Sequence, residues 1–302
     1  MSVKNLNNEF SLSSGKSSLK FKTGEGGIPV VEIKNDQASA VISLQGTHVL
    51  SWKRVNEDEV IWLSSDAEYK LGKPVRGGIP ICWPWFGAHE SDSSFPSHGF
   101  ARNVFWKVID TKMITADETE ITFRLTTDEL DEKYKNIWPQ PTVVEYKLSI
   151  GERLTMELTT FNKSDQTISI GQALHTYFNI DDIDNTKVYG LDGKIYLDKT
   201  EGLVSKTQDG PIGINSEVDR IYLDTEDDIT IDDQTRQITI KKQGSRSTVV
   251  WNPWKEVAKK MGDLDDEGYR KMLCVESANV AKDVVNIKPN ESHSLFVSYN
   301  IQ

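Results

Sequence analysis

The stretch TVVEYKLSIGERLTMELTTF, residues 142–161, alternates apolar and polar residues on both sides of the dipeptide Gly151–Glu152. Side chains along a β-strand point to opposite faces in turn, so a period of two predicts a strand with one buried face. Two such runs joined by a short glycine-containing turn are typical of a β-hairpin. This stretch therefore predicts two adjacent antiparallel strands.

The same alternation recurs along the whole chain. It is found in SLKFKTG (18–24), PVVEIKN (29–35), SAVISLQG (39–46), EVIWLSS (59–65), VFWKVID (104–110), EITFRLTT (120–127), TISIGQAL (167–174), RQITIKKQG (236–244), TVVWNP (248–253) and SLFVSYNIQ (294–302). Such a series predicts an all-β fold, a large antiparallel β-sandwich. No break in composition indicates a second domain, so we expect one domain over residues 1–302, with 1–16 as a peripheral or poorly ordered segment.

Helical patterns are few and short. In NPWKEVAKKM (252–261), Asn252 can cap a helix whose first position is Pro253. TTDELDEKYK (126–135) is a second candidate helix. The acidic runs NIDDIDN (179–185) and DTEDDITIDD (224–233) lack the spacing of a calcium loop, and we interpret them as solvated loops.

Composition excludes several classes of function. The 302 residues include 35 basic and 46 acidic side chains, for a formal charge of −11, which argues against binding to nucleic acid or an anionic membrane. The two cysteines, Cys82 and Cys274, have neither the spacing nor the partners of a zinc site. The first residues contain no apolar run of the kind found in signal peptides, so a cytoplasmic location is expected.

One irregular segment concentrates polar functional groups. VRGGIPICWPWFGAHESDSSFPSHGFAR (75–102) places Arg76 beside Gly77 and Gly78, and ends with Arg102. Glycine allows close approach of the backbone to a ligand, and the arginine fork matches the oxygens of a phosphate. Each arginine could equally cap a loop or pair with a carboxylate, and spacing alone leaves these alternatives open.

Two residues farther along the chain are candidates for proton transfer. His175 in ALHTYF adjoins apolar strand residues, and its side chain titrates near neutral pH. Glu276 closes the apolar run MLCV, where burial would raise the pKa of a carboxylate toward that of a general base. A buried structural histidine and a carboxylate bonded to backbone amides are the alternatives.

The order of these motifs along the chain is more specific than any one of them. Arg76 with its two glycines is followed by HGFAR, ALHTYF, DRIY, VVWNPW and CVESANV. This series resembles the hexose-6-phosphate mutarotases, or glucose-6-phosphate 1-epimerases, which are aldose 1-epimerase-like proteins. The resemblance extends from about residue 19 to 299. It implies a galactose-mutarotase-type sandwich, or supersandwich, with a concave sugar-binding face.

The resemblance also implies roles for individual residues. His175 matches the general acid of the family, and Glu276 matches its general base. Arg76 and Arg102 match the arginines that hold the substrate phosphate.

Three further residues match sugar-binding positions of the family. Asp219 matches an aspartate that binds sugar hydroxyls, although the neighbouring Arg220 allows the alternative of a surface ion pair. His98 matches a histidine near the sugar ring, which implies binding rather than proton transfer. Ser97 stands where the family often has a polar amide, so any contact that it makes with substrate would be shorter or water-bridged.

The function implied by the resemblance is interconversion of the α and β anomers of glucose 6-phosphate, or of another hexose 6-phosphate. No metal or organic cofactor is implied, and we expect a monomer that acts on a small molecule. Two alternatives remain at this point, namely an epimerase for unphosphorylated aldoses and a non-catalytic carbohydrate-binding protein on the same fold. The presence of both His175 and Glu276 favours an enzyme.

Overall fold

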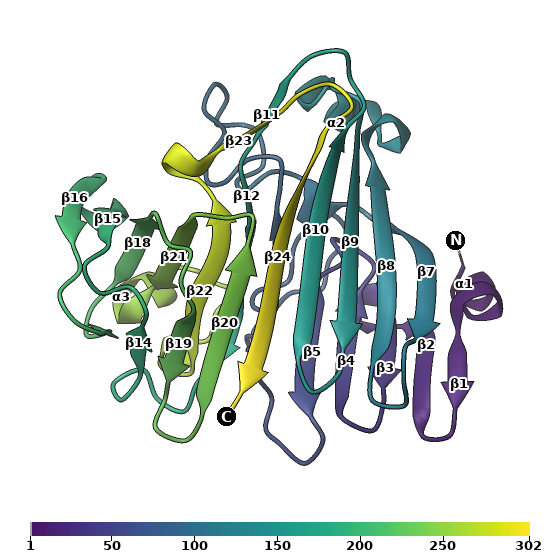
Figure 1. The fold of residues 1–302 in the computed structure, drawn as a ribbon, viewed down its shortest axis with the longest axis horizontal. Helices are drawn as coiled ribbons and strands as arrows, with labels where there is room; N and C mark the ends of the chain where they lie inside the picture. Colours follow the sequence, from purple (N-terminus) through teal and green to yellow (C-terminus); the bar gives the residue numbers. More distant parts are fainter. Residues whose placement is uncertain (1) are drawn as a thin grey trace.

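The computed structural model describes residues 2–302, and antiparallel β-sheets dominate it, as the alternating sequence predicts (Figure 1). The largest sheet has nine strands. Their order is β17 (Ile212–Gly213), β14 (Lys187–Tyr189), β19 (Ile229–Asp232), β20 (Gln237–Gln243), β24 (Ser292–Ile301), β10 (Leu154–Asn162), β9 (Thr142–Ile150), β8 (Thr119–Thr126) and β7 (Lys107–Met113).

Two further sheets cover this one. A five-stranded sheet contains β1 (Leu12–Ser14), β2 (Ser17–Thr23), β3 (Pro29–Lys34), β4 (Ala38–Ser43) and β5 (Val49–Arg54), in chain order. An eight-stranded sheet has the order β16 (Val204–Thr207), β15 (Ile195–Asp198), β18 (Val218–Leu223), β21 (Ser247–Asn252), β22 (Met272–Asn279), β12 (Gln172–Leu174) and β6 (Ile81–Cys82), and β13 (Tyr177–Asn179) also pairs with β22. A small sheet joins β11 (Ile168–Ile170) to β23 (Val285–Ile287).

The apolar core lies between these layers. In Figure 1, β2–β5 lie behind β7–β10, and β21 and β22 lie behind β19 and β20. Alternate residues of the hairpin 142–161, such as Val144, Leu148 and Leu158, are fully buried in one continuous cluster with side chains of the covering sheets. The predicted hairpin is confirmed, because Ile150 pairs with Leu154 across a turn at residues 151–153.

Not every alternating run forms a strand. Residues 59–65 make only isolated bridges, Ile61 to Phe178 and Leu63 to Gly77, so the strand predicted there is wrong. The reason is that the amides and carbonyls of this segment bond to several different segments rather than to one ladder. Conversely, part of the acidic run 224–233 is a strand, because Ile229 and Ile231 are buried in β19.

The two predicted helices are shorter in the structure than the sequence indicates, and α1 lies in the segment 1–16, where no helix was predicted. Residues 2–302 contain three α-helices, α1 (Val3–Phe10), α2 (Glu132–Ile137) and α3 (Trp254–Ala258), and 3-10 turns at Glu25–Gly27, Ala101–Asn103, Thr127–Glu129, Lys199–Glu201, Gly268–Arg270 and Ala281–Asp283. The candidate 126–135 is broken into a 3-10 turn and α2, because the backbone of Leu130 between them is extended. The candidate 252–261 retains only α3, and Asn252 Oδ1 accepts the Trp254 amide at its start. None of the helices in residues 2–302 is long and apolar enough to cross a membrane.

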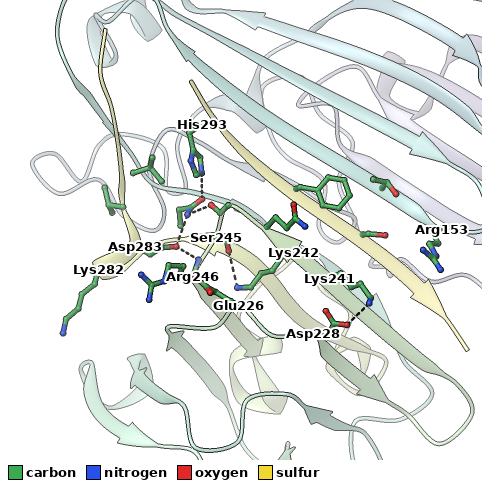
Figure 2. A pocket seen from close by; sticks show the side chains of 18 residues that line it. Arg153, Glu226, Asp228, Lys241, Lys242, Ser245, Arg246, Lys282, Asp283 and His293 are labelled. Carbon is green, nitrogen blue, oxygen red and sulfur yellow. Dashed lines mark hydrogen bonds and ion pairs between the residues drawn. The ribbon is translucent and has the colours of Figure 1, made fainter. Parts of the chain in front are cut away.

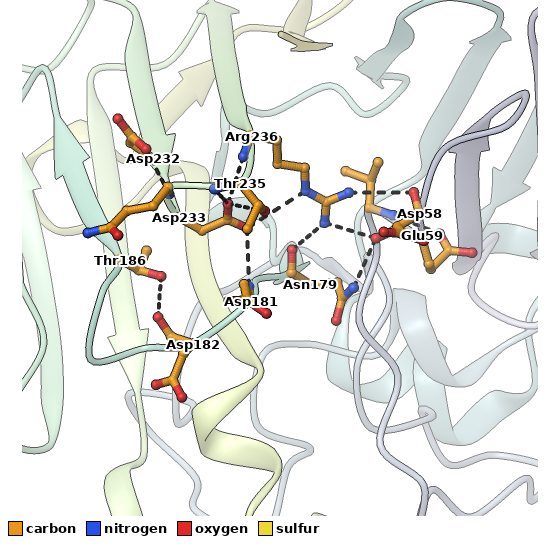
Figure 3. A network of polar contacts seen from close by, with 12 residues as sticks. Asp58, Glu59, Asn179, Asp181, Asp182, Thr186, Asp232, Asp233, Thr235 and Arg236 are labelled. Atoms are coloured by element: carbon orange, nitrogen blue, oxygen red, sulfur yellow. Dashed lines mark hydrogen bonds and ion pairs between the residues drawn. The ribbon is translucent and has the colours of Figure 1, made fainter.

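A polar network joins the sheets at one end of the molecule (Figure 3). Arg236, in the turn between β19 and β20, donates through Nη2 to the carbonyl oxygens of Glu59 (2.9 Å) and Asn179 (2.6 Å). Buried Asp233 in the same turn accepts the Asp181 amide. These bonds tie the nine-stranded sheet to the end of β13, and so fix the strand that follows the candidate acid His175.

Candidate functional site

Glu276 lies in the middle of β22, on the face turned away from the main core. Leu273 and Val275 belong to the main core, whereas Cys274 and Ala278 belong to smaller clusters on the other face. Because side chains alternate along a strand, Glu276 shares that other face. Its side chain is only 1% exposed.

His175 lies in the two-residue interruption between β12 and β13, and both of these strands pair with β22. Leu174 pairs with Ser277 and Tyr177 pairs with Cys274, so residues 175 and 176 lie opposite 276 and 275. The His175 amide donates to the Pro80 carbonyl (3.1 Å), which anchors the interruption to β6. Strand register therefore places His175 beside Glu276, although the two are remote in sequence.

The two candidate side chains are in direct contact. His175 Nε2 lies 3.3 Å from Glu276 Oε1, while Glu276 Oε2 and His175 Nδ1 are buried with no partner among residues 2–302. Burial raises the pKa of Glu276 and lowers the pKa of His175, since it disfavours both charged forms. Both directions are consistent with one proton shared by the pair. Moving that proton across the contact from Glu276 to His175 produces a carboxylate base and an imidazolium acid.

A cavity of about 380 Å³ opens beside His175. Its walls are Glu68, Lys73, Pro74, Val75, Arg76, Pro80, Ser97, His98, Arg102, His175, Tyr177 and Asp263. The structure thus brings together both predicted arginines, Ser97, His98 and the candidate acid in one concavity. Such a concavity with a few convergent polar groups is typical of a small-molecule site.

Arg102 has fewer hydrogen-bond partners within the protein than Arg76. Its Nη2 donates to the Ser97 carbonyl (2.8 Å), and its Nε is buried without a partner among residues 2–302. No carboxylate of the described chain lies within ion-pair distance of it. Its charge therefore remains available to an anion in the cavity.

The guanidinium group of Arg76 already makes three hydrogen bonds within the protein. Its Nε and Nη2 donate to the two oxygens of Asp263 (3.0 and 3.3 Å), and its Nη1 donates to the Tyr177 hydroxyl (3.0 Å). The Tyr177 ring in turn stacks on the His175 ring, with centroids 4.9 Å apart and planes 10° apart. Asp263, Arg76 and Tyr177 thus form a chain of contacts that ends on the candidate acid.

The glycine pair beside Arg76 serves the fold. Gly77 and Gly78 have φ values of +104° and +71°. A Cβ on Gly78 would lie 2.3 Å from His48 Nε2, and a Cβ on Gly77 would lie 2.5 Å from the Trp62 carbonyl oxygen. The close approach expected of these glycines is therefore an approach to neighbouring chain, which holds Arg76 at the cavity wall.

His98 has a fixed tautomer. Its Nδ1 accepts the Gly87 amide (3.3 Å), and because a backbone amide can only donate, Nδ1 carries no proton. Burial, together with the nearby charges of Arg102, Lys199 and Arg76, lowers the pKa of His98 to about 3. The neutral ring thus carries its proton on Nε2. Its centroid lies 5.6 Å from that of His175, so His98 is a hydrogen-bond donor near the acid.

Asp219 lies on β18 at the edge of the site. Its Oδ2 accepts Lys199 Nζ (2.6 Å), not Arg220 as the sequence alternative suggested, and it does not line the cavity itself. It pairs across the sheet with Trp251, whose ring contacts the His175 ring edge-on. After burial, the charge of Asp219 is the next cause of the raised pKa of Glu276, so Asp219 influences the base through space.

Sequence reasoning missed several of these residues. Tyr177 is two positions from His175 in the same motif, and this spacing could have indicated it. Asp263 and Lys199 lie in polar segments that carry no distinguishing pattern. Only the fold brings their side chains to Arg76 and Asp219.

A larger cleft, about 1070 Å³, lies between β20, β24 and the end of β22 (Figure 2). Its charges are largely paired, as in Lys241 with Asp228 (2.9 Å) and Arg246 with Glu226 (3.1 Å). Buried Lys242 donates to the hydroxyls of Thr225, Ser245 and Thr248 and to the Ser247 carbonyl. His175 lines the smaller cavity and not this cleft, so we assign the chemistry to the smaller cavity.

Comparisons with known proteins agree with this fold. A candidate glucose-6-phosphate 1-epimerase of Escherichia coli K12 is 34% identical over 269 residues, which is 88% of either chain. One from Cenchrus ciliaris is 38% identical over 263 residues, 83% of this chain and 78% of that relative. The crystal structure of a candidate mutarotase, YeaD from Salmonella typhimurium, matches with a TM-score of 0.87 and 31% identity, over 97% of this chain and 95% of that one. Residues 29–300 match the family model described as aldose 1-epimerase. The chain therefore belongs to the aldose 1-epimerase family and is an isomerase.

Proposed function

We propose that this isomerase interconverts the α and β anomers of glucose 6-phosphate. The observation that carries the proposal is the contact between His175 and Glu276 beside a cavity bordered by two arginines. An acid and a base side by side suit an acetal carbon, because one of its two oxygens must lose a proton while the other gains one. The relatives named as candidate glucose-6-phosphate 1-epimerases support the choice of substrate.

The reaction opens and recloses the sugar ring. Glu276, as carboxylate, takes the proton of the anomeric hydroxyl while His175, as imidazolium, gives a proton to the ring oxygen. The bond between C1 and the ring oxygen breaks, which leaves an open-chain aldehyde. Rotation about C1–C2 presents the other face of the aldehyde, and reversal of both proton transfers closes the ring. Each positioned proton donor or acceptor typically contributes about 10²- to 10⁴-fold.

Recognition of the sugar falls to the other residues of the cavity. Arg102 and the remaining donors of Arg76 bind the phosphate at C6, which orients the ring with its anomeric end at the acid and base. His98 donates from Nε2 to a sugar oxygen, and Asp219 accepts from a hydroxyl at the edge of the site. Ser97 contacts the sugar directly or through a water molecule.

Polarimetry on freshly dissolved α-glucose 6-phosphate and α-glucose tests the proposal. The protein should accelerate the approach to equilibrium rotation for the phosphorylated sugar, and His175→Asn and Glu276→Gln should each abolish the acceleration. His89→Asn, which changes a half-buried histidine of the segment 75–102 that does not line the cavity, is the matched control. Equal acceleration of glucose would refute the phosphate preference, and sugar binding without acceleration would identify a carbohydrate-binding protein.

A further inference from the structure

The guanidinium group of Arg76 is only partly available to a ligand. It has five N–H donors, and three are used, by the two oxygens of Asp263 and by the Tyr177 hydroxyl. Five minus three leaves two donors, one on Nη1 and one on Nη2. Two neighbouring N–H groups of an arginine match two oxygens of one phosphate.

Asp263 itself is part of the cavity wall. Its side chain is 30% exposed, and it lines the same cavity as Arg76 and Arg102. A phosphate that binds the open edge of Arg76 therefore comes within range of a carboxylate that binds the other edge. The fold holds Asp263 there, because Gly262 has a φ of +62° and the Asp265 amide donates to Ser64 Oγ.

We infer that Asp263 is a specificity-determining residue of the site. It orients the Arg76 fork toward the phosphate, and its negative charge limits how tightly the site holds a dianion. This inference rests on the function proposed above, because it needs a phosphorylated sugar on Arg76.

Weak phosphate binding suits this reaction. Both anomers carry the same phosphate, so an interaction with it binds substrate, intermediate and product alike. Uniform binding of this kind does not lower the barrier of the chemical step, and excess affinity slows product release. A carboxylate beside the phosphate keeps the orientation that arginine provides while it reduces the affinity.

The size of the effect follows from the geometry of a guanidinium group. A carboxylate and a phosphate on its two edges are about 7 Å apart. At that distance in a water-like dielectric, Coulomb's law predicts that the carboxylate weakens the binding of a dianion roughly sevenfold compared with a site that lacks the carboxylate. For a monoanion, the same calculation predicts that binding is weakened roughly two- to threefold.

The test compares Asp263→Asn with Asp266→Asn. Asparagine is isosteric and keeps one oxygen for Arg76, whereas Asp266 is an exposed acid of the same loop outside the cavity. Competitive inhibition of glucose 6-phosphate mutarotation is measured with inorganic phosphate at pH 8, a dianion, and with glucose 6-sulfate, a monoanion. Asp263→Asn should tighten inhibition by phosphate about sevenfold and by the sulfate ester two- to threefold, while Asp266→Asn keeps the wild-type constants.

The inference is overturned if Asp263→Asn weakens phosphate inhibition or leaves it unchanged, or if both anions respond equally. The first result would mean that orientation of Arg76 is the whole role of Asp263. Failure of the proposed function looks different, since the wild-type protein would then show no preference for glucose 6-phosphate over glucose and no competition by phosphate.

Discussion

Replacing Lys242 by Met should change how the stability of the protein depends on pH. Lys242, labelled in Figure 2, is 7% exposed, and its ammonium group lies among four oxygens of neutral groups. Burial lowers the pKa of Lys242 to about 7, against the opposing effect of the negative charges of Asp283 and Glu226. In the unfolded chain the side chain keeps its ordinary pKa of about 10.4.

The sign of the effect follows from proton counting. Between pH 7 and about 10.4 the unfolded chain binds more protons at this position than the folded chain, so the free energy of unfolding rises with pH. From pH 7 to pH 9 these two pKa values correspond to a gain of about 2 kcal/mol. Below pH 7 both states are mostly protonated, and little further change is expected.

Urea unfolding at pH 7, 8 and 9 measures this gain. The difference in unfolding free energy between wild type and Lys242→Met should grow by about 2 kcal/mol in favour of the wild type over this range. Lys241→Met is the control, because Lys241 is exposed and pairs with Asp228 at the surface. Parallel pH curves for wild type and Lys242→Met would show that Lys242 stays charged in the fold, and would refute the reasoning.

Other predictions concern the cavity and the packing around it. Arg102→Ala should lower kcat/KM for glucose 6-phosphate by about 10- to 150-fold, since a charge-assisted hydrogen bond contributes about 1.5–3 kcal/mol. The same variant should affect the turnover of glucose much less, and equal losses for the two sugars in polarimetry would contradict the phosphate-binding role of Arg102. Gly78→Ala should destabilise the protein by more than 2 kcal/mol in urea unfolding, because its Cβ would overlap His48. Gly15→Ala, at a similar φ of +58° in open space, should cost only about 1 kcal/mol. Arg236→Met should cost about 2 kcal/mol by removing the hydrogen bonds of Arg236 to the Glu59 and Asn179 carbonyls. Arg246→Met, at an exposed ion pair, should cost less than about 1 kcal/mol, and similar losses for the two variants would argue against the network of Figure 3.

Local alternation was a good guide to the strands. The hairpin 142–161 is read correctly because each face of β9 and β10 has one environment along its whole length. The same rule fails at residues 59–65, where successive backbone groups bond to different segments. The alternation of apolar residues indicates which side chains are buried. Burial alone does not make a segment pair with a neighbouring strand along its whole length.

Five of the predicted site residues, Arg76, Ser97, His98, Arg102 and His175, line one cavity, but the sequence did not indicate which side chains pair with one another. No spacing in the sequence indicates that His175 faces Glu276, because that depends on how β12 and β13 pair with β22. The pairing of Arg76 with Asp263 depends on a turn 187 residues away along the chain. Such contacts are decided by tertiary packing, and a single sequence carries little information about them.

The place of β24 in the nine-stranded sheet has a consequence for biosynthesis. This strand lies between β10 and β20 and is the last of the described strands to be made. Until residue 301 has left the ribosome, the strands β7–β10 and the group β14, β17, β19 and β20 are separate, and each exposes an unpaired edge. Once β10 and β20 are made, their free edges are open to intermolecular strand pairing, and the sheet can close only after synthesis has passed β24.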